Sequence, residues 1–212
     1  MTDGVIEAVL FDFGGVVLTS PFEAFSRYEA EAGVPDGLLR TLNSTNPDTN
    51  AWAQLERSEV TIDEFCALYE AEAAAAGHTI EGSRVLEALA GDLRPEMVEA
   101  VRRCAARLKT ACLTNNFITT PGHVDREQQM ADVMSLFHVV VESSKVGVRK
   151  PDRRFYEMAC ELLDVKPEEC VFLDDLGINL KPAKAMGMTT IKVLNAPQAI
   201  ADLEAVVGFP LS

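Results

Sequence analysis

The sequence predicts an α/β protein whose parallel sheet carries helices on both faces and is interrupted after its first strand by a helical insertion. Short, nearly continuous apolar runs recur along the chain and alternate with segments whose apolar residues repeat at helical spacing. Strands that are apolar at successive positions are typical of a parallel sheet buried on both faces. Between residues 18 and 94 only helical patterns occur, which places the insertion directly after the first strand.

Five apolar runs are the predicted strands, and turn-forming or polar residues bound each one: residues 6–11, 110–113, 139–141, 170–173 and 189–194. The predicted helices of the sheet domain lie between these runs. Residues 95–108 and 152–163 each carry an apolar stripe at helical spacing, and a shorter helix is predicted to begin at Pro182.

The insertion is predicted to be a helical cap domain. Its apolar residues, for example Ile62, Phe65 and Tyr69, recur at helical spacing, and no strand pattern interrupts them. A long helical excursion after the first strand is typical of such a cap. We therefore predict a core domain of residues 1–17 and 95–212 and a cap domain of residues 18–94.

Composition narrows the possible partners and the compartment. The 212-residue chain has a formal net charge of −14, which repels a nucleic-acid backbone, so no nucleic-acid partner is predicted. Its five cysteines form no CxxC pair, which favours free thiols in a reducing compartment. No signal peptide is evident, and no apolar segment reaches the roughly 20 residues that span a bilayer. We expect a cytoplasmic protein without a membrane partner; its oligomeric state is not predicted.

Polar residues follow several of the predicted strands, at the edge where open parallel sheets bind ligands. Asp12 follows the first strand, and Lys150 precedes the helix predicted at residue 152. The second strand is followed by Thr114 and Asn115, and the fourth by Asp174 and Asp175. Each of these residues taken alone is also typical of an ordinary turn or a solvated surface. Their common place at one edge of the sheet is what favours a functional site.

Three carboxylates in a partly buried cleft would repel one another unless a divalent cation neutralised them. Carboxylate and carbonyl oxygens are the ligands that suit Mg²⁺. A magnesium ion together with a lysine, a hydroxyl group and backbone amides makes a site for a phosphoryl group. These residues therefore predict Mg²⁺-assisted chemistry on a small phosphate-bearing molecule.

Four stretches of the sequence resemble the motifs of the haloacid dehalogenase-like hydrolase superfamily: FDFGGVV, LTNN, VGVRKP and VFLDDLGINLKPAKAMGM. They are most similar to the subgroup that contains the phosphatase domain of soluble epoxide hydrolase. The resemblance covers residues 7–18 and 110–194, and the insertion matches in place and helical character. It implies a three-layer, Rossmann-like core with an inserted all-helical cap.

The resemblance also implies roles for individual residues. Asp12 would be the nucleophile that takes the phosphoryl group as an aspartyl-phosphate. Lys150 would neutralise both Asp12 and the transferring group, while Thr114 and Asn115 would hold phosphate oxygens. The implied Mg²⁺ ligands are Asp12, the backbone carbonyl of Gly14, Asp174 and Asp175. Asn179 would steady Lys150 through a hydrogen bond.

The function implied is a Mg²⁺-dependent phosphatase that hydrolyses a small phosphate monoester. Gly14 departs from the pattern, because phosphatases of this superfamily usually carry there a second aspartate that protonates the leaving group and later activates water. A weakly active or non-catalytic binding module of the same superfamily is therefore an alternative. A 2-haloacid dehalogenase is a further one, since it uses an aspartate nucleophile without the second acid or a metal. Such an enzyme would not be expected to keep the acid pair Asp174 and Asp175.

Overall fold

The protein is built on a five-stranded parallel sheet with the strand order β3-β2-β1-β4-β5, and the first strand lies at its centre. The computed structural model describes residues 5–88, 91–116 and 124–211. The strands are β1 (Ala8–Phe11), β2 (Lys109–Thr114), β3 (Val139–Glu142), β4 (Cys170–Asp174) and β5 (Thr189–Lys192). Each strand falls within or slightly beyond one of the five predicted apolar runs, so the predicted fold class is confirmed.

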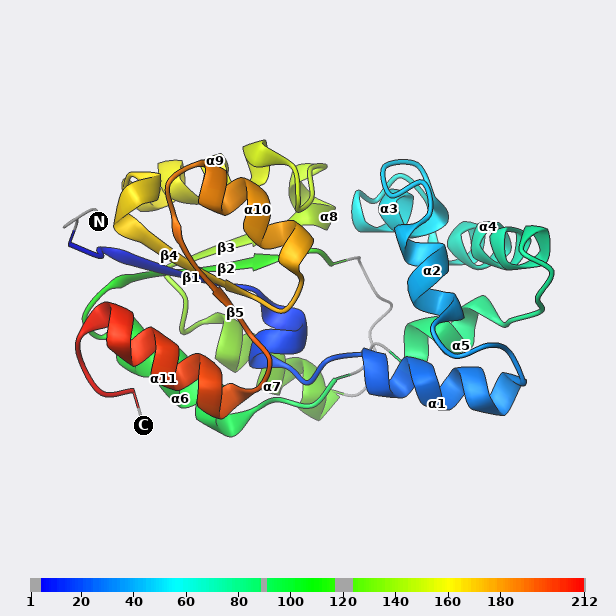
Figure 1. The fold of residues 1–212 in the computed structure, drawn as a ribbon, viewed down its shortest axis with the longest axis horizontal. Coiled ribbons are helices and arrows are strands. Elements are labelled where there is room, and N and C mark those ends of the chain that lie inside the picture. Colours follow the sequence, from blue (N-terminus) through cyan, green and yellow to red (C-terminus); the bar gives the residue numbers. More distant parts are fainter. Residues whose placement is uncertain (1–4, 89–90, 117–123, 212) are drawn as a thin grey trace.

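Helices cover both faces of this sheet, as Figure 1 shows. Successive residues of β1 point to opposite faces, so Val9 and Phe11 pack with one set of helices and Ala8 and Leu10 with the other. The first face carries α6 (Pro95–Ala105), α7 (Val124–Met134) and α11 (Ala196–Val207), and the second carries α9 (Arg153–Leu163) and α10 (Gly177–Ala185). No helix within the described ranges is long and apolar enough to cross a bilayer.

The helix predicted to begin at Pro182 begins five residues earlier, at Gly177, so that prediction is wrong. Pro182 lies inside α10 beyond its first turn, a position where proline is usually disfavoured. The residue just before the helix is Leu176, whose backbone N–H donates a hydrogen bond to Asp174 Oδ1 at 2.7 Å. The helix therefore starts close to the end of β4.

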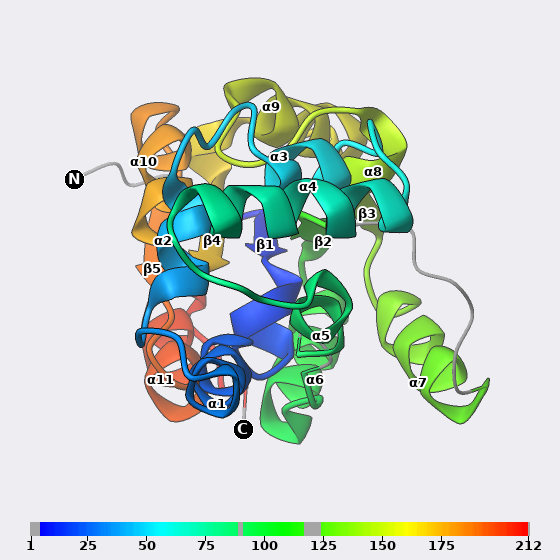
Figure 2. The same ribbon diagram turned by 90° about the vertical axis from the view of Figure 1, so that its right-hand side faces the viewer.

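Residues 18–94, which the sequence predicts to be a helical insertion, contain α1 (Phe22–Ala32), α2 (Leu38–Ser44), α3 (Ala51–Glu56), α4 (Ile62–Ala75) and α5 (Gly82–Glu87). These helices enclose an apolar cluster of their own, in which Phe25, Phe65 and Tyr69 are buried. Figures 1 and 2 show the insertion standing beyond the carboxyl ends of the strands. Its two connections to the sheet domain run side by side, joined by a bridge between Leu18 and Leu93.

Candidate active site

The carboxyl edge of the sheet gathers three acidic side chains. Asp12 follows β1, Asp174 ends β4, and Asp175 comes next in the chain. Because β1 and β4 are neighbours that pair Phe11 with Leu173, their ends deliver these acids to the same place. One oxygen from each carboxylate lies within 4.8 Å of the other two. The structure therefore brings together the three acids that the sequence placed at this edge.

Lys150 forms ion pairs with two of these carboxylates. Its Nζ lies 2.7 Å from Asp12 Oδ1 and 2.9 Å from Asp174 Oδ2, and its side chain is 1% exposed. Burial disfavours the ammonium ion, but the attraction of Asp12 and Asp174 outweighs it and raises the pKa of Lys150. The buried lysine is therefore charged and ion-paired at the centre of the cluster.

Asp175 is the acid of the cluster that Lys150 does not pair with. Burial, together with the neighbouring charge of Asp174, raises the pKa of Asp175 to about 6, while Lys150 and Arg94 act in the opposite direction. Burial raises the pKa of Asp12 as well, although Lys150 opposes that rise. One ammonium group thus faces three carboxylates whose oxygens converge. This set offers only hard oxygen ligands and an excess of negative charge, so it fits a divalent cation of the Mg²⁺ type. Asp12, Asp174 and Asp175 are the side chains that could hold it.

Asn179 contacts a different partner from the one predicted. Its Nδ2 donates to both oxygens of Asp174, at 3.1 and 3.0 Å, rather than bonding to Lys150. The geometry explains the difference, because Asn179 lies in α10 just after the loop that Asp174 itself begins. Asn179 therefore orients the carboxylate that in turn pairs with Lys150, and it supports the lysine indirectly.

Asn115 also makes contacts that the sequence did not predict. Its side-chain amide accepts a hydrogen bond from the backbone N–H of Lys150 at 2.8 Å and donates one to the carbonyl of Lys150 at 3.0 Å. These two bonds fix the backbone that carries the lysine. Thr114 is buried at the end of β2, beside β1, so its hydroxyl group lies at the same edge. Its predicted contact with phosphate stays a prediction, as does that of Asn115.

The two glycines after Asp12 have different structural requirements. Gly15 has φ +76°, and a Cβ atom there would lie 2.2 Å from Asp175 Oδ2. Gly14 has φ −68°, and a Cβ atom there would have no neighbour within 4 Å. Only Gly15 is therefore required for the backbone to approach the acid cluster closely. The carbonyl of Gly14 belongs to the same turn and stays a predicted metal ligand.

Sequence reasoning missed a polar network that ties β2 to the neighbouring strand. Asn116 donates through Nδ2 to Glu142 at 2.9 Å, and its Oδ1 accepts from the hydroxyl of Ser144 at 2.9 Å. Its backbone N–H donates to the hydroxyl of Ser143 at 2.9 Å. The second asparagine of LTNN was the one signal in the sequence, and its partners lie too far along the chain to be recognised. This network holds the β2 end in place beside the acids.

Arg94 is a second residue that the sequence did not single out. It lies in the connection that returns from the insertion, and its Nη1 donates to the carbonyl of Gly15 at 3.1 Å. The guanidinium group also counteracts the raised pKa of Asp175. Arg94 thus supports the glycine turn from the side of the insertion.

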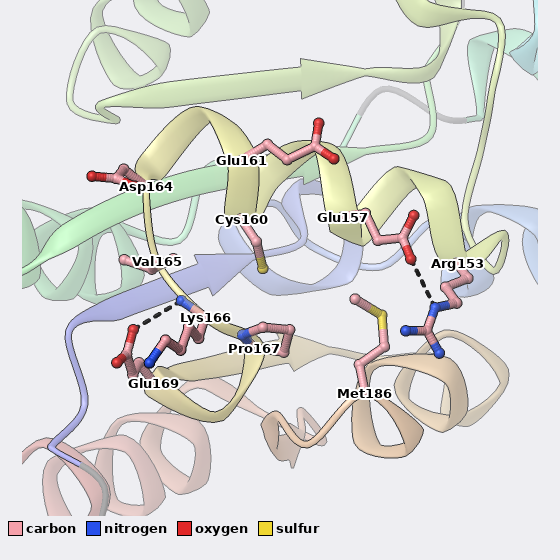
Figure 3. Close-up of a pocket in the computed structure, with 10 residues that line it drawn as sticks. All are labelled: Arg153, Glu157, Cys160, Glu161, Asp164, Val165, Lys166, Pro167, Glu169 and Met186. Atoms are coloured by element: carbon pink, nitrogen blue, oxygen red, sulfur yellow. Dashed lines mark hydrogen bonds and ion pairs between the residues drawn. The ribbon is translucent and has the colours of Figure 1, made fainter.

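A groove of about 470 Å³ lies elsewhere, at the amino end of β4, between α9 and the end of α10. Figure 3 shows Cys160, Lys166 and Met186 among the side chains that line it, with Arg153 paired to Glu157 at one end. None of the predicted site residues lines this groove. It is therefore not part of the candidate active site.

Comparison with known families shows to which family of hydrolases the chain belongs. Residues 6–187, from β1 through α10, match the haloacid dehalogenase-like hydrolases. The chain belongs to this family. The resemblance predicted from the four sequence motifs is thereby confirmed, and the protein is a haloacid dehalogenase-like hydrolase whose acid cluster lies in the matched region.

Curated relatives of this hydrolase include parts of larger proteins. Acyl-CoA dehydrogenase family member 10 of Mus musculus is 35% identical over 214 residues, which cover 96% of this chain and 19% of that protein. Bifunctional epoxide hydrolase 2 of Mus musculus is 30% identical, covering 96% of this chain and 39% of its own length. The sesquiterpene phosphatase of Aspergillus oryzae is 26% identical, covering 95% of this chain and 97% of its own length.

Solved structures of other haloacid dehalogenase-like proteins share the fold. A hydrolase of this kind from Porphyromonas gingivalis superposes with a TM-score of 0.69 at 20% identity, covering 96% of this chain and 98% of that one. A family enzyme from Bacteroides thetaiotaomicron, in complex with magnesium and inorganic phosphate, has a TM-score of 0.63 at 17% identity, covering 93% and 98%. At these identities the likeness establishes the common architecture.

Proposed function

We propose that this hydrolase is a Mg²⁺-dependent phosphatase that cleaves a small phosphate monoester through an aspartyl-phosphate on Asp12. One observation carries the proposal: the buried ammonium group of Lys150 bridges Asp12 and Asp174 while Asp175 lies alongside. A dehalogenase needs the aspartate nucleophile and no metal, so a dehalogenase function would not explain why three acids lie together. A phosphatase uses all four groups.

Among the described residues, the hydrogen bond and the ion pair that orient Asp12 both involve its Oδ1. Oδ1 accepts a hydrogen bond from the backbone N–H of Phe13 at 2.6 Å and pairs with Lys150 at 2.7 Å. Oδ2 is therefore the oxygen that attacks phosphorus in the proposed reaction. The attack breaks the ester P–O bond and releases the leaving group as an alkoxide or phenoxide, which takes a proton from water. A water molecule then attacks the phosphorus of the aspartyl-phosphate, which releases inorganic phosphate and regenerates the Asp12 carboxylate.

Lys150 and Thr114 are proposed to stabilise the transferring group. The charge of Lys150 lies beside the nucleophile, so it can attract phosphoryl oxygens as negative charge builds up on them. The Thr114 hydroxyl would donate a hydrogen bond from the neighbouring strand. A bound Mg²⁺, held by Asp12, Asp174, Asp175 and the Gly14 carbonyl, would neutralise the carboxylates and the phosphoryl oxygens. Asn115 and Asn179 keep the lysine and Asp174 in position.

We further propose that residues 18–94 act as a cap over this edge and that residues 1–17 and 95–212 form the core. The helices of the insertion have their own apolar cluster and stand beyond the strand ends that bear the acids. A cap in that place would enclose a small phosphate ester and exclude water. The phosphatase among the relatives, and a relative in structure that binds magnesium and phosphate, support the same substrate class.

The proposal is tested by turnover of p-nitrophenyl phosphate with Mg²⁺ and with EDTA, beside halide release from chloroacetate. We expect phosphate release that requires Mg²⁺ and no halide release. Asp12→Asn should lower kcat/KM at least about 10³-fold, because the nucleophile acts as part of one unit with its neighbours. Halide release without phosphate release, or turnover unaffected by EDTA, would contradict the proposal.

A further inference from the structure

A buried ion pair connects the insertion to the segment that carries Lys150. Glu56, the last residue of α3, places Oε2 2.9 Å from Nε of Arg149, which directly precedes the lysine. The Glu56 side chain is 8% exposed and that of Arg149 is 18% exposed. Most other ion pairs among the described residues lie on the surface or within one element, so this pair is unusual in joining two distant parts of the chain.

The buried carboxylate of Glu56 has a polar neighbour at each of its two oxygens. Its Oε1 accepts a hydrogen bond from Nε1 of Trp52 at 3.1 Å, while Oε2 faces the guanidinium group. Burial raises the pKa of Glu56, and Arg149 and the Trp52 hydrogen bond oppose that rise. A buried carboxylate that lost its cation would be left uncompensated, which is strongly unfavourable. Glu56 therefore depends on the insertion remaining seated against Arg149.

Arg149 also contacts the backbone of Lys150. The N–H at its Nε donates to the backbone carbonyl of Lys150 at 3.3 Å, and the same carbonyl accepts from Asn115. The contact with Glu56 is therefore an ion pair, and Glu56 Oε2 accepts no hydrogen bond among the described residues. The backbone of Lys150 is thus held by Asn115 and by Arg149, and Arg149 in turn pairs with Glu56 of the insertion. Near α3, two further hydrogen bonds join described residues of the insertion and the sheet domain, from the Ser58 hydroxyl to the Ser144 carbonyl and from Arg149 to the Pro47 carbonyl, and both are exposed to solvent.

We propose that Glu56 is a positioning residue for Lys150. Through its ion pair with Arg149, the position of the catalytic ammonium group depends on whether the cap is docked against the sheet domain. When the pair is formed, the cap is docked and the Lys150 backbone is held by both Asn115 and Arg149. When the pair breaks, the cap is released and the lysine loses one of its two supports. This inference rests on the proposed phosphatase function, in which Lys150 stabilises the transferring group.

Trp52 provides a reporter for this ion pair that needs no catalysis. It is the one tryptophan of the sequence, and its indole N–H is bonded to Glu56. We expect Arg149→Ala to shift the emission of Trp52 to longer wavelength and to increase its quenching by acrylamide, because the pair no longer holds α3 against the sheet domain. Arg153→Ala is the matched control, since it removes the same charge from a side chain that is 65% exposed and paired to Glu157. Equal spectra for the two variants would overturn the proposal.

Kinetics test the second half of the proposal. We expect Glu56→Gln to lower kcat for p-nitrophenyl phosphate about 10-fold to 10²-fold, the scale of a small misplacement of a catalytic group. KM should change less than about three-fold, and Arg149→Lys should retain more activity than Arg149→Ala. The double variant Glu56→Gln/Arg149→Ala should lose no more than the worse single variant, because both break one pair. Additive losses would contradict a shared role.

A series of phosphate esters separates positioning from proton transfer. If Glu56 positions Lys150, Glu56→Gln lowers the rate by the same factor for aryl and alkyl esters. A loss confined to esters with poor leaving groups would show that Glu56 protonates the leaving group, and would overturn the proposal. A wild type without phosphatase activity would refute the proposed function instead; the Trp52 comparison, repeated with Mg²⁺ and inorganic phosphate, would still decide whether the pair holds the insertion.

Discussion

Gly14 and Gly15 stand next to each other in the turn after β1, yet a methyl group has opposite consequences at the two positions. We expect Gly15→Ala to destabilise the protein by about 1–3 kcal/mol, because φ is positive and the new Cβ would overlap Asp175. Gly14→Ala should be neutral or stabilising by about 0.4–1 kcal/mol, since the unfolded chain loses freedom and the folded chain has room. Urea unfolding of both variants checks this; equal losses would mean that the turn has a different conformation.

The absence of a carboxyl group at Gly14 should appear in the dependence of rate on the leaving group. Protonation of the leaving group is worth roughly 10²–10⁴-fold in rate. Without that help, esters of phenols, acyl groups or anomeric sugar oxygens should react much faster than alkyl esters. Rates at the chemical step, measured over esters of graded leaving-group pKa, should therefore fall steeply.

Gly14→Asp should flatten this dependence, because the turn has space for the side chain and its φ is ordinary. Gly14→Asn is the control, since it has the same size and no acidic proton. A flat series in the wild type would contradict the idea that the missing acid limits the reaction.

At the scale of elements, Asn115 links the end of β2 to the segment before α9 through the backbone of Lys150. We expect Asn115→Ala to lower kcat about 10-fold to 10²-fold and stability by about 1–3 kcal/mol, as buried backbone groups lose their partner. Asn195→Ala is the matched control. It removes the cap of α11, which bonds the N–H of Gln198, and should cost about 1 kcal/mol without affecting turnover. Equal kinetic losses in both variants would show that Asn115 acts only through stability.

Strands and helices with a strong apolar pattern were predictable because burial on the sheet requires that pattern. The start of α10 was not, since a proline inside the helix suggested a later beginning and the hydrogen bond from Leu176 to Asp174 leaves no pattern in the sequence. The contacts of Asn115, Asn179 and Arg94 were missed for a related reason. Each depends on a partner brought near by the fold, and a sequence shows residue types without showing which partner they meet.

At the scale of the whole molecule, the convergence of the acids at one edge followed from parallel strands and from their order along the chain. Asp12, Asp174 and Asp175 were predicted to lie together on that basis, and Lys150 was expected near them. The ion pair between Glu56 and Arg149 could not have been foreseen, because nothing in the sequence relates α3 to the segment before α9. Contacts between separate parts of the chain are the information that only the structure adds.

Binding of Mg²⁺ should stabilise the whole protein, because the native state alone assembles the three acids. At ten times the dissociation constant the stabilisation is about 1.4 kcal/mol. For a chain of this size that corresponds to a rise in Tm of about 3–6 °C. Asp175→Asn should remove most of the shift, whereas Asp202→Asn, an exposed acid on α11, should leave it unchanged. A Tm that ignores millimolar Mg²⁺ would show that the acids do not form a metal site.

The most direct measurement is the covalent state of Asp12 during turnover. Because Gly14 supplies no group to activate water, hydrolysis of the aspartyl-phosphate should be slow compared with its formation from p-nitrophenyl phosphate, and the phospho-enzyme should accumulate. The reaction is quenched in acid within milliseconds, and the intact mass and the peptide that contains Asp12 are measured, with Asp12→Asn as the blank. We predict one added phosphoryl group per chain, on Asp12, in the presence of Mg²⁺. Turnover with an unmodified Asp12 peptide, or a phosphoryl group on another residue, would contradict the account.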